Sequence, residues 1–404
     1  MAIFAAALAI RLIAIEVTGA NRIEFGDAAD YIASAQSLCT QHAYPDRGNL
    51  PFFRAPGLPF FIAGVTACHP RSVRMIKYGL AICDALTCVL IAILAGRAAW
   101  IAGLIASIHP VFVAQVCDVR SEPLFMLLLT LAIFLLLRNA TTGAGVSVAL
   151  AALARPSALI CIPLFALYRP RRAHVLLIAS LLTLAPWTIR NVVRFQRVIV
   201  VNDAGGFGIW RGTHPDVIAL THERDRAKYA REAREFEVHT IAATHGDWTR
   251  LAIENIRAHP REEVLFTIEK AWLYWRPWLN PMEYSRKIVA ASAAFIIPLY
   301  AFGFIGIVRA RRWDVLVFFG VMWLAHLPFQ MGLRLRVPFT DPLLIVFAAV
   351  ELNNLVVKLG ADRRFRLVRA AGDVRRDDEA RIVRQRTAGR FGIEHVERQA
   401  GEMT

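Results

Sequence analysis

The sequence of 404 residues has little charge and lacks the short motifs of soluble catalysts. Asp, Glu, Lys and Arg make up 20% of it, against about 25% in soluble domains, whereas 56% is hydrophobic. It contains no glycine-rich phosphate loop, no CxxC pair, no HExxH and no GxSxG. These absences argue against a soluble enzyme and give no support to a covalent nucleophile.

The chain also has few cysteines. Six in 404 residues are too few for a disulfide framework. Cys39 and Cys68 fall in one polar region, where we expect free thiols, with a disulfide as the less favoured alternative. The remaining cysteines lie in apolar runs and are interpreted as core residues: Cys83, Cys88, Cys117 and Cys161.

Long apolar runs separated by short arginine clusters predict an all-α polytopic membrane protein. A bilayer core of about 30 Å needs roughly 20 apolar residues per helix. A helical hairpin divided at Arg155 is expected within 143–168, because only an even number of crossings there keeps the short arginine connectors cytoplasmic. About ten transmembrane helices result, with both termini cytoplasmic. The expected spans are residues 1–15, 75–95, 98–116, 121–137, 143–154, 157–168, 173–189, 288–308, 313–331 and 337–357.

The excess of basic residues follows this topology. The net charge is +15, which in a soluble protein would suggest nucleic acid. Here much of the charge lies between apolar segments, so membrane lipids are the expected partners and nucleic acid is not. The predicted parts are an N-terminal membrane module of residues 1–189 with an outward loop at 16–74, a large and mainly helical extracytoplasmic segment at 190–287, C-terminal transmembrane helices at 288–357, and a cytoplasmic basic tail at 358–404.

Arginines on the outer side are disfavoured by the positive-inside rule and need a reason. Any one of them can snorkel or pair with a neighbouring acid. As a group they favour an anionic ligand, because the guanidinium fork suits phosphate. The arginines expected at outer helix ends or loops are Arg54, Arg120, Arg155, Arg190, Arg334 and Arg336.

Acids on the same side are few. Asp27 and Asp30 are three residues apart on an expected helix and therefore share a face. Asp118 and Glu122 lie at the outer start of the fourth span, where an acid often only caps a helix. Asp84 lies within a span, where an ionisable group is expected to be functional or paired, and the sequence names no partner for it.

Several weak motifs occur in one order between about Arg11 and Glu351. They are Asp27 with Tyr31, Ala35 and Leu38; RAPGLP from Arg54; SEPLF from Ser121; ARP around Arg155; PWTIRN from Pro186; and RLRVP from Arg334. Together they resemble the polytopic glycosyltransferases of the C-type superfamily, in the family 39-like branch of protein O-mannosyltransferases and the lipid A aminoarabinose transferase.

The resemblance implies an inverting glycosyltransferase that takes a sugar from a polyprenyl-phosphate carrier and passes it to an envelope lipid, glycan or protein. It implies a bacterial cytoplasmic membrane protein whose site faces the periplasm. Asp27 is the expected base, with Asp30 and Glu122 as further catalytic acids. The residues expected to bind substrate are Tyr31, Arg54, Asp118, Arg155, Arg190, Arg334 and Arg336. Ala28 stands where the family has a second acid, so no metal and no cofactor are expected.

Two other classes of function remain open. A lipid or sugar transporter or flippase without chemistry explains an intramembrane Asp84 and a basic outer mouth, but not the outer soluble segment. A structural subunit of an envelope complex explains least. The sugar, the acceptor and the oligomeric state are not readable from the residues.

Overall fold

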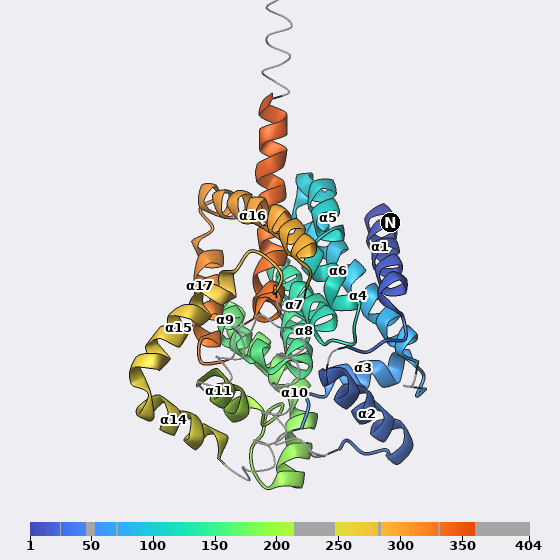
Figure 1. Cartoon of the computed structure of the whole chain (residues 1–404), viewed down its shortest axis with the longest axis vertical. Coiled ribbons are helices and arrows are strands. Elements are labelled where there is room, and N and C mark those ends of the chain that lie inside the picture. The colour runs from blue at the N-terminus through green and yellow to red at the C-terminus, as the bar shows by residue number, and fades with distance from the viewer. Residues whose placement is uncertain are drawn as a thin grey trace, which may run out of the picture. The chain divides into compact units, whose positions relative to one another are not determined.

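The computed structural model describes residues 1–24, 26–45, 53–69, 72–213, 247–281, 284–329 and 332–359. Within these ranges every regular element is a helix and none is a strand, which confirms the all-α expectation (Figure 1). The first half contains α1 (Ala2–Thr18), α2 (Gly26–Gln41), α3 (Gly57–Val65), α4 (Val73–Leu94), η1 (Gly96–Ala98), α5 (Ala99–Ser107), α6 (Pro110–Val116), α7 (Glu122–Leu137), α8 (Thr141–Ala154), η2 (Pro156–Ile160) and α9 (Cys161–Tyr168).

The second half continues the helical pattern. It contains η3 (Pro170–Arg172), α10 (Ala173–Phe195), α11 (Gly205–Thr213), α14 (Trp248–Ala258), α15 (Pro260–Trp275), α16 (Arg286–Arg309) and α17 (Trp313–His326). A last helix, Leu333–Leu359, is called the C-terminal helix below. Within the segment 190–287, expected to be mainly helical, α11, α14 and α15 are helices, whereas residues 214–246 lie outside the described residues.

Four described helices are long and apolar enough to cross a membrane: α4, the η3–α10 segment, α16 and the C-terminal helix. A fifth span results if α5 and α6 are one helix bent by 53°, and Pro110 lies at that break. Four more apolar helices are shorter: α7, α8, η2–α9 and α17. Helices of this kind mark an integral membrane protein. A helix lies at each of the ten expected spans, and the number of complete crossings remains a prediction.

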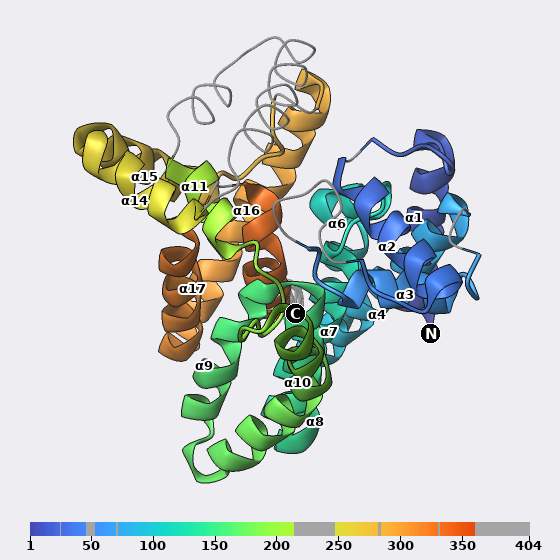
Figure 2. The ribbon, with the colours of Figure 1, turned by 90° about the horizontal axis from the view of Figure 1, so that it is seen from below.

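The break expected at Arg155 is present. Arg155 adopts an extended backbone (φ −146°, ψ 118°) between α8 and η2, and Pro156 begins the next helix. A residue before proline avoids the helical conformation, and this explains why the chain turns at this point. Figure 2 shows α8, α9 and α10 side by side, and α8 also packs on α7. The tip of the hairpin thereby presents Arg155 at one end of the bundle.

A glycine places the short helix α3 against that hairpin. A Cβ atom on Gly57 would lie 2.7 Å from the backbone of Ala154, so any other residue would push the two elements apart. The RAPGLP segment and the ARP segment are therefore neighbours in space. This close approach brings Arg54 near Arg155.

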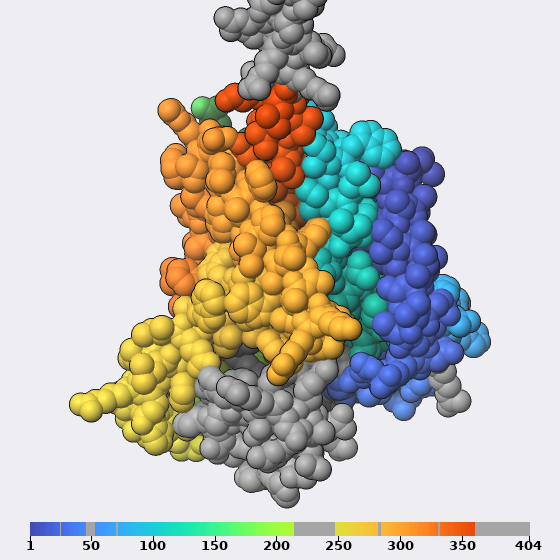
Figure 3. All heavy atoms as spheres, turned by 45° about the horizontal axis from the view of Figure 1, so that its top comes forward, coloured from blue at the N-terminus to red at the C-terminus, as the bar shows by residue number. Residues whose placement is uncertain are grey.

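A buried ion pair joins α1 to α4. Arg11 donates to Asp84 at 2.6 Å, and neither side chain has solvent exposure. Arg11 also donates to the carbonyls of Ala106 and Ser107 in α5. Figure 3 shows the dark blue surface of α1 beside the cyan surface of α5. Arg11 is thus the partner that the sequence did not identify, and Asp84 is a packing residue.

The less favoured alternative for the two polar cysteines is the one observed. Cys39, in α2, and Cys68, just after α3, form a disulfide, and the other four cysteines are free. Disulfides persist mainly in oxidising compartments. The bond closes the loop 39–68, which carries Arg54, whereas Asp27 and Asp30 precede it in the same helix as Cys39. All of the contacts described below lie in the compact unit Met1–Glu351.

Candidate functional site

Two acids of α2 converge on one arginine. Arg54 donates to Asp27 at 2.8 Å and to Asp30 at 2.6 Å. The guanidinium carbon lies 5.6 Å from the centre of the Tyr31 ring, which is itself buried. The two carboxylates are about one-third exposed and Arg54 is 15% exposed. The expectation that Asp27 and Asp30 share a face is confirmed, and that face is turned toward Arg54.

The backbone around Arg54 is held by hydrogen bonds from distant segments. The Tyr44 hydroxyl donates to the Arg54 carbonyl at 2.8 Å, and the Phe53 N–H donates to Asp203 at 3.2 Å. Burial by itself lowers the pKa of Arg54, but the negative charge of Asp27 and the neighbouring acid raise it more, so its guanidinium stays charged. Burial, and next the charge of Asp27, raise the pKa of Tyr31, so its hydroxyl stays neutral.

A second acid–arginine pair lies at the start of α7. Glu122 is 2% exposed and pairs with Arg155, 18% exposed, at 2.7 Å. Arg155 also donates to the Ser121 hydroxyl at 3.4 Å and lies 5.9 Å from the Phe125 ring. Glu122 therefore does more than begin its helix, because it is the buried counter-ion of the arginine at the hairpin tip.

Arg334 connects the two pairs. It lies in the first turn of the C-terminal helix, its guanidinium is 4.0 Å from the second oxygen of Asp27, and its charge also acts on Glu122. At 41% exposure it is the most accessible arginine of the group. We name these six side chains the acid–arginine cluster: Asp27, Asp30, Arg54, Glu122, Arg155 and Arg334. They come from five separate segments of the chain.

Arg336 does not belong to this cluster. The helix begins at Leu333, before the expected position 337, so residues 334 and 336 point to opposite sides, about 200° apart around its axis. Arg336 is fully buried and pairs with Asp341 at 2.8 Å, and Asp341 lies 3.2 Å from His109. The Tyr300 ring lies 4.9 Å from its guanidinium. The structure thus places Arg336 in a buried ion pair and not at the expected outer position, and a role for it in binding substrate stays a prediction.

Asp118 is also placed differently from the expectation. Its carboxylate is buried and accepts hydrogen bonds from the backbone N–H groups of Glu24 and Val119, at 3.1 and 2.7 Å. Lys77 holds the same loop by donating to the carbonyls of Gly19 and Arg22. Asp118 therefore anchors the connection between α1 and α2, and its expected contact with substrate stays a prediction.

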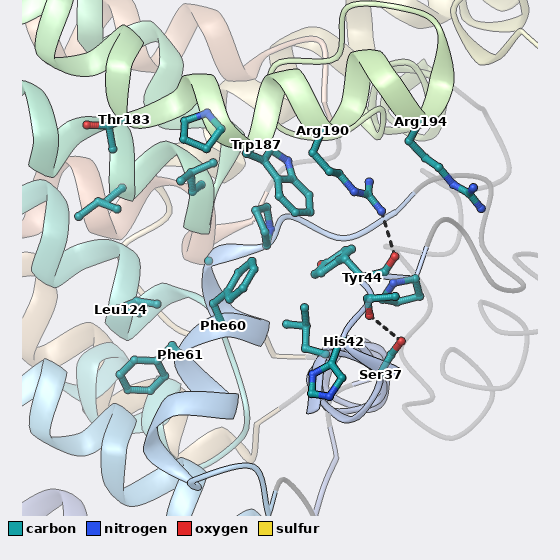
Figure 4. A pocket seen from close by; sticks show the side chains of 18 of the residues that line it. Ser37, His42, Tyr44, Phe60, Phe61, Leu124, Thr183, Trp187, Arg190 and Arg194 are labelled. Carbon is teal, nitrogen blue, oxygen red and sulfur yellow. Dashed lines mark hydrogen bonds between the residues drawn. The ribbon is translucent and has the colours of Figure 1, made fainter. Parts of the chain in front are cut away.

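Arg190 lines a large cavity beside the cluster. The cavity, about 1140 Å³, lies between α2, α3, α7, α8 and α10. Figure 4 shows Arg190 and Arg194 at one end, with Trp187, Tyr44 and Phe60 along the wall. Arg190 donates to the Tyr44 carbonyl at 2.9 Å and its guanidinium carbon lies 5.1 Å from the centre of the Trp187 ring. Most of the remaining wall is apolar: Leu38, Phe61, Leu124, Leu128, Leu150 and Leu153.

Two residues of this region were missing from the expected set. Arg194 follows Arg190 by four residues on the same helix, so helical spacing was an available signal. Tyr44 had none, because its role depends on contacts with Arg54 and Arg190 that only packing creates. In the part of the chain that the structure describes, no group of three His, Cys, Asp or Glu residues offers a metal site.

Comparison with known proteins gives a limited answer. No family model matches the chain, and no curated protein matches it. Among solved structures it is similar to the crystal structure of ArnT from Cupriavidus metallidurans bound to undecaprenyl phosphate, with a TM-score of 0.39 and 14% sequence identity over 85% of this chain and 76% of that one.

Proposed function

We propose that this chain is an inverting glycosyltransferase that moves a sugar from a polyprenyl-phosphate carrier to an envelope lipid, glycan or protein on the extracytoplasmic side of the bacterial cytoplasmic membrane. The observation that supports it most is the approach of Arg334 to Asp27. The two side chains lie 4.0 Å apart and are 41% and 33% exposed. A carboxylate for the acceptor proton and a cation for a phosphate leaving group thus lie side by side.

The chemistry assigns a role to each part of the cluster. Asp27 takes the proton of the acceptor hydroxyl while that oxygen attacks the anomeric carbon. The bond from this carbon to the phosphate oxygen breaks on the opposite face, which inverts the centre and releases polyprenyl phosphate. Arg334 and Arg155 stabilise the charge that develops on the phosphate. Arg54 orients Asp27, and Asp30 shares Arg54 with it.

The cavity beside the cluster supports a lipid-linked donor. Its wall is mostly apolar and includes five leucines and two phenylalanines, and Phe60 is 53% exposed at the surface. An apolar cavity of this size suits part of a long isoprenoid chain. Arg190 and Arg194 at one end provide positive charge where the chain meets its phosphate.

The transporter alternative was favoured mainly by Asp84, an acid within a predicted span. An intramembrane acid on a transport pathway is expected to face a cavity or water. Asp84 has no solvent exposure and its carboxylate pairs with Arg11 at 2.6 Å. Its charge is therefore paired within the packing of α1 and α4, although its second oxygen has no hydrogen-bond partner among the described residues.

Purified protein given a polyprenyl-phosphate sugar and an envelope extract tests the proposal. We expect release of polyprenyl phosphate, measured by mass spectrometry. Arg334→Gln should weaken apparent donor affinity about 10- to 100-fold, since a hydrogen bond to a charged group contributes about 1.5–3 kcal/mol. Arg74→Gln is the matched control, because Arg74 is also exposed and acid-paired, with Glu16 at 2.8 Å, but lies outside the cluster. Movement of intact donor without release of polyprenyl phosphate would favour the transporter.

A further inference from the structure

A second cavity lies among α7, α9, α17 and the C-terminal helix. It measures about 520 Å³, within the range of roughly 300–1,000 Å³ that is typical of ligand sites. Of its lining residues, all except Tyr168, Arg312 and Asp314 are apolar. Leu167 and Val317 are 75% and 63% exposed, so the cavity is a groove that opens on the surface of the apolar helices. We call it the arginine-end groove.

The polar mouth of the groove lies where α7 and α9 end and α17 begins. Arg312 donates to both oxygens of Asp314, at 2.9 and 2.7 Å, so this pair contributes little net charge. The adjoining connectors carry Arg138, Arg171 and Arg172, all exposed. The mouth therefore has an excess of positive charge.

Arg169 is the arginine most closely tied to the groove. Its guanidinium carbon lies 5.1 Å from the centre of the Tyr168 ring, and it donates to the Leu136 carbonyl at 3.2 Å; Tyr168 and Leu136 both line the groove. Among the residues that the structure describes, its Nε–H is buried without a hydrogen-bond partner, and no carboxylate pairs with it. A buried donor of this kind costs free energy until an acceptor fills the place.

We infer that the arginine-end groove binds an anionic phospholipid, with an acyl chain along the apolar wall and the phosphate at Arg169. The apolar wall suits a hydrocarbon chain and offers no polar partner to a water-soluble anion away from the mouth. Asp314 would repel a phosphate, but Arg312 neutralises it. Anionic lipid is abundant on the cytoplasmic leaflet, to which the short arginine connectors of this end are assigned. The site is separate from the acid–arginine cluster and does not depend on the proposed reaction.

Delipidated protein in detergent is titrated with dioleoyl phosphatidylglycerol and with dioleoyl phosphatidylcholine, and binding is followed by native mass spectrometry and thermal unfolding. We expect phosphatidylglycerol to bind at least about tenfold more tightly. Arg169→Gln should remove most of that difference, because a charge-assisted contact changes affinity by about tenfold or more. Val317→Trp, a substitution at an exposed lining position, should weaken binding of both lipids.

Arg309→Gln is the matched control. Arg309 is an exposed arginine at the same end that pairs with Glu351, which does not line the groove, whereas Arg169 donates to the lining residue Leu136. Equal affinity for the two lipids would overturn the inference, as would an equal loss in Arg309→Gln and Arg169→Gln. Inorganic phosphate that stabilises the protein as much as phosphatidylglycerol does would show an ion site and would also overturn it. If Arg169→Gln fails to fold, Val317→Trp tests the inference instead, and unchanged binding of both lipids by that variant would overturn it.

Discussion

Replacing Asp27 by asparagine separates a catalytic role from a packing role. Asn keeps the size of the side chain and one oxygen for the Arg54 contact, which is 2.8 Å in the native protein, but it removes the negative charge and the basicity. A positioned general base contributes typically about 10²–10⁴ in rate, equivalent to about 3–5 kcal/mol of barrier. We expect turnover to fall by that factor, measured as polyprenyl phosphate released from a saturating sugar donor.

The cost to stability should be much smaller. Asp27 is about one-third exposed, and ion pairs of this exposure contribute about 0.2–1 kcal/mol. The matched control is Asp30→Asn, since Asp30 is equally exposed, lies one turn further along α2 and pairs with the same Arg54 at 2.6 Å. We expect that variant to retain most of its turnover. A folded Asp27→Asn protein with turnover near that of the wild type, or equal losses in the two variants, would refute the assignment of Asp27 as the base.

Three further predictions concern the same unit. Breaking the Cys39–Cys68 disulfide by a double serine substitution should lower the free energy of unfolding by about 2–4 kcal/mol, because the bond closes a long loop. Reductant should lower the thermal midpoint of the wild type and leave that of the variant unchanged. In intact cells an impermeant maleimide should label Glu254→Cys and spare Ala310→Cys; labelling of both would contradict the topology. Burial and the charge of Asp27 raise the pKa of Tyr31, so its hydroxyl remains protonated. Tyr31→Phe should therefore leave the alkaline side of the pH–rate profile unchanged from about pH 6 to 10. A changed alkaline side would show that Tyr31 titrates during turnover.

Local sequence was sufficient to predict most helices and the break between α8 and η2. Apolar runs and the Arg155-Pro156 step act over a few residues, so they need no knowledge of distant partners. The same holds for Asp27 and Asp30, because a spacing of three places two side chains on one face of any helix. The arginines and acids of the cluster were also recognised as a group from their place at outer helix ends.

Which arginine meets which acid was decided only by the tertiary structure. Arg334 and Arg336 belong to one short motif, yet the start of the C-terminal helix at Leu333 turns the first toward Asp27 and the second into a buried pair with Asp341. Asp118, expected at the substrate, accepts a hydrogen bond from the backbone N–H of Glu24 in a neighbouring loop.

The Arg11–Asp84 pair shows the physical reason most directly. The two residues are 73 positions apart, and nothing in the local pattern around either one identifies the other. A sequence determines how each helix orients its own side chains, since that depends on a repeat of 3.6 residues. The sequence leaves open which helix lies opposite, because the choice depends on the packing of many apolar faces at once. Charged side chains that this packing buries must then pair with whichever polar groups lie nearby.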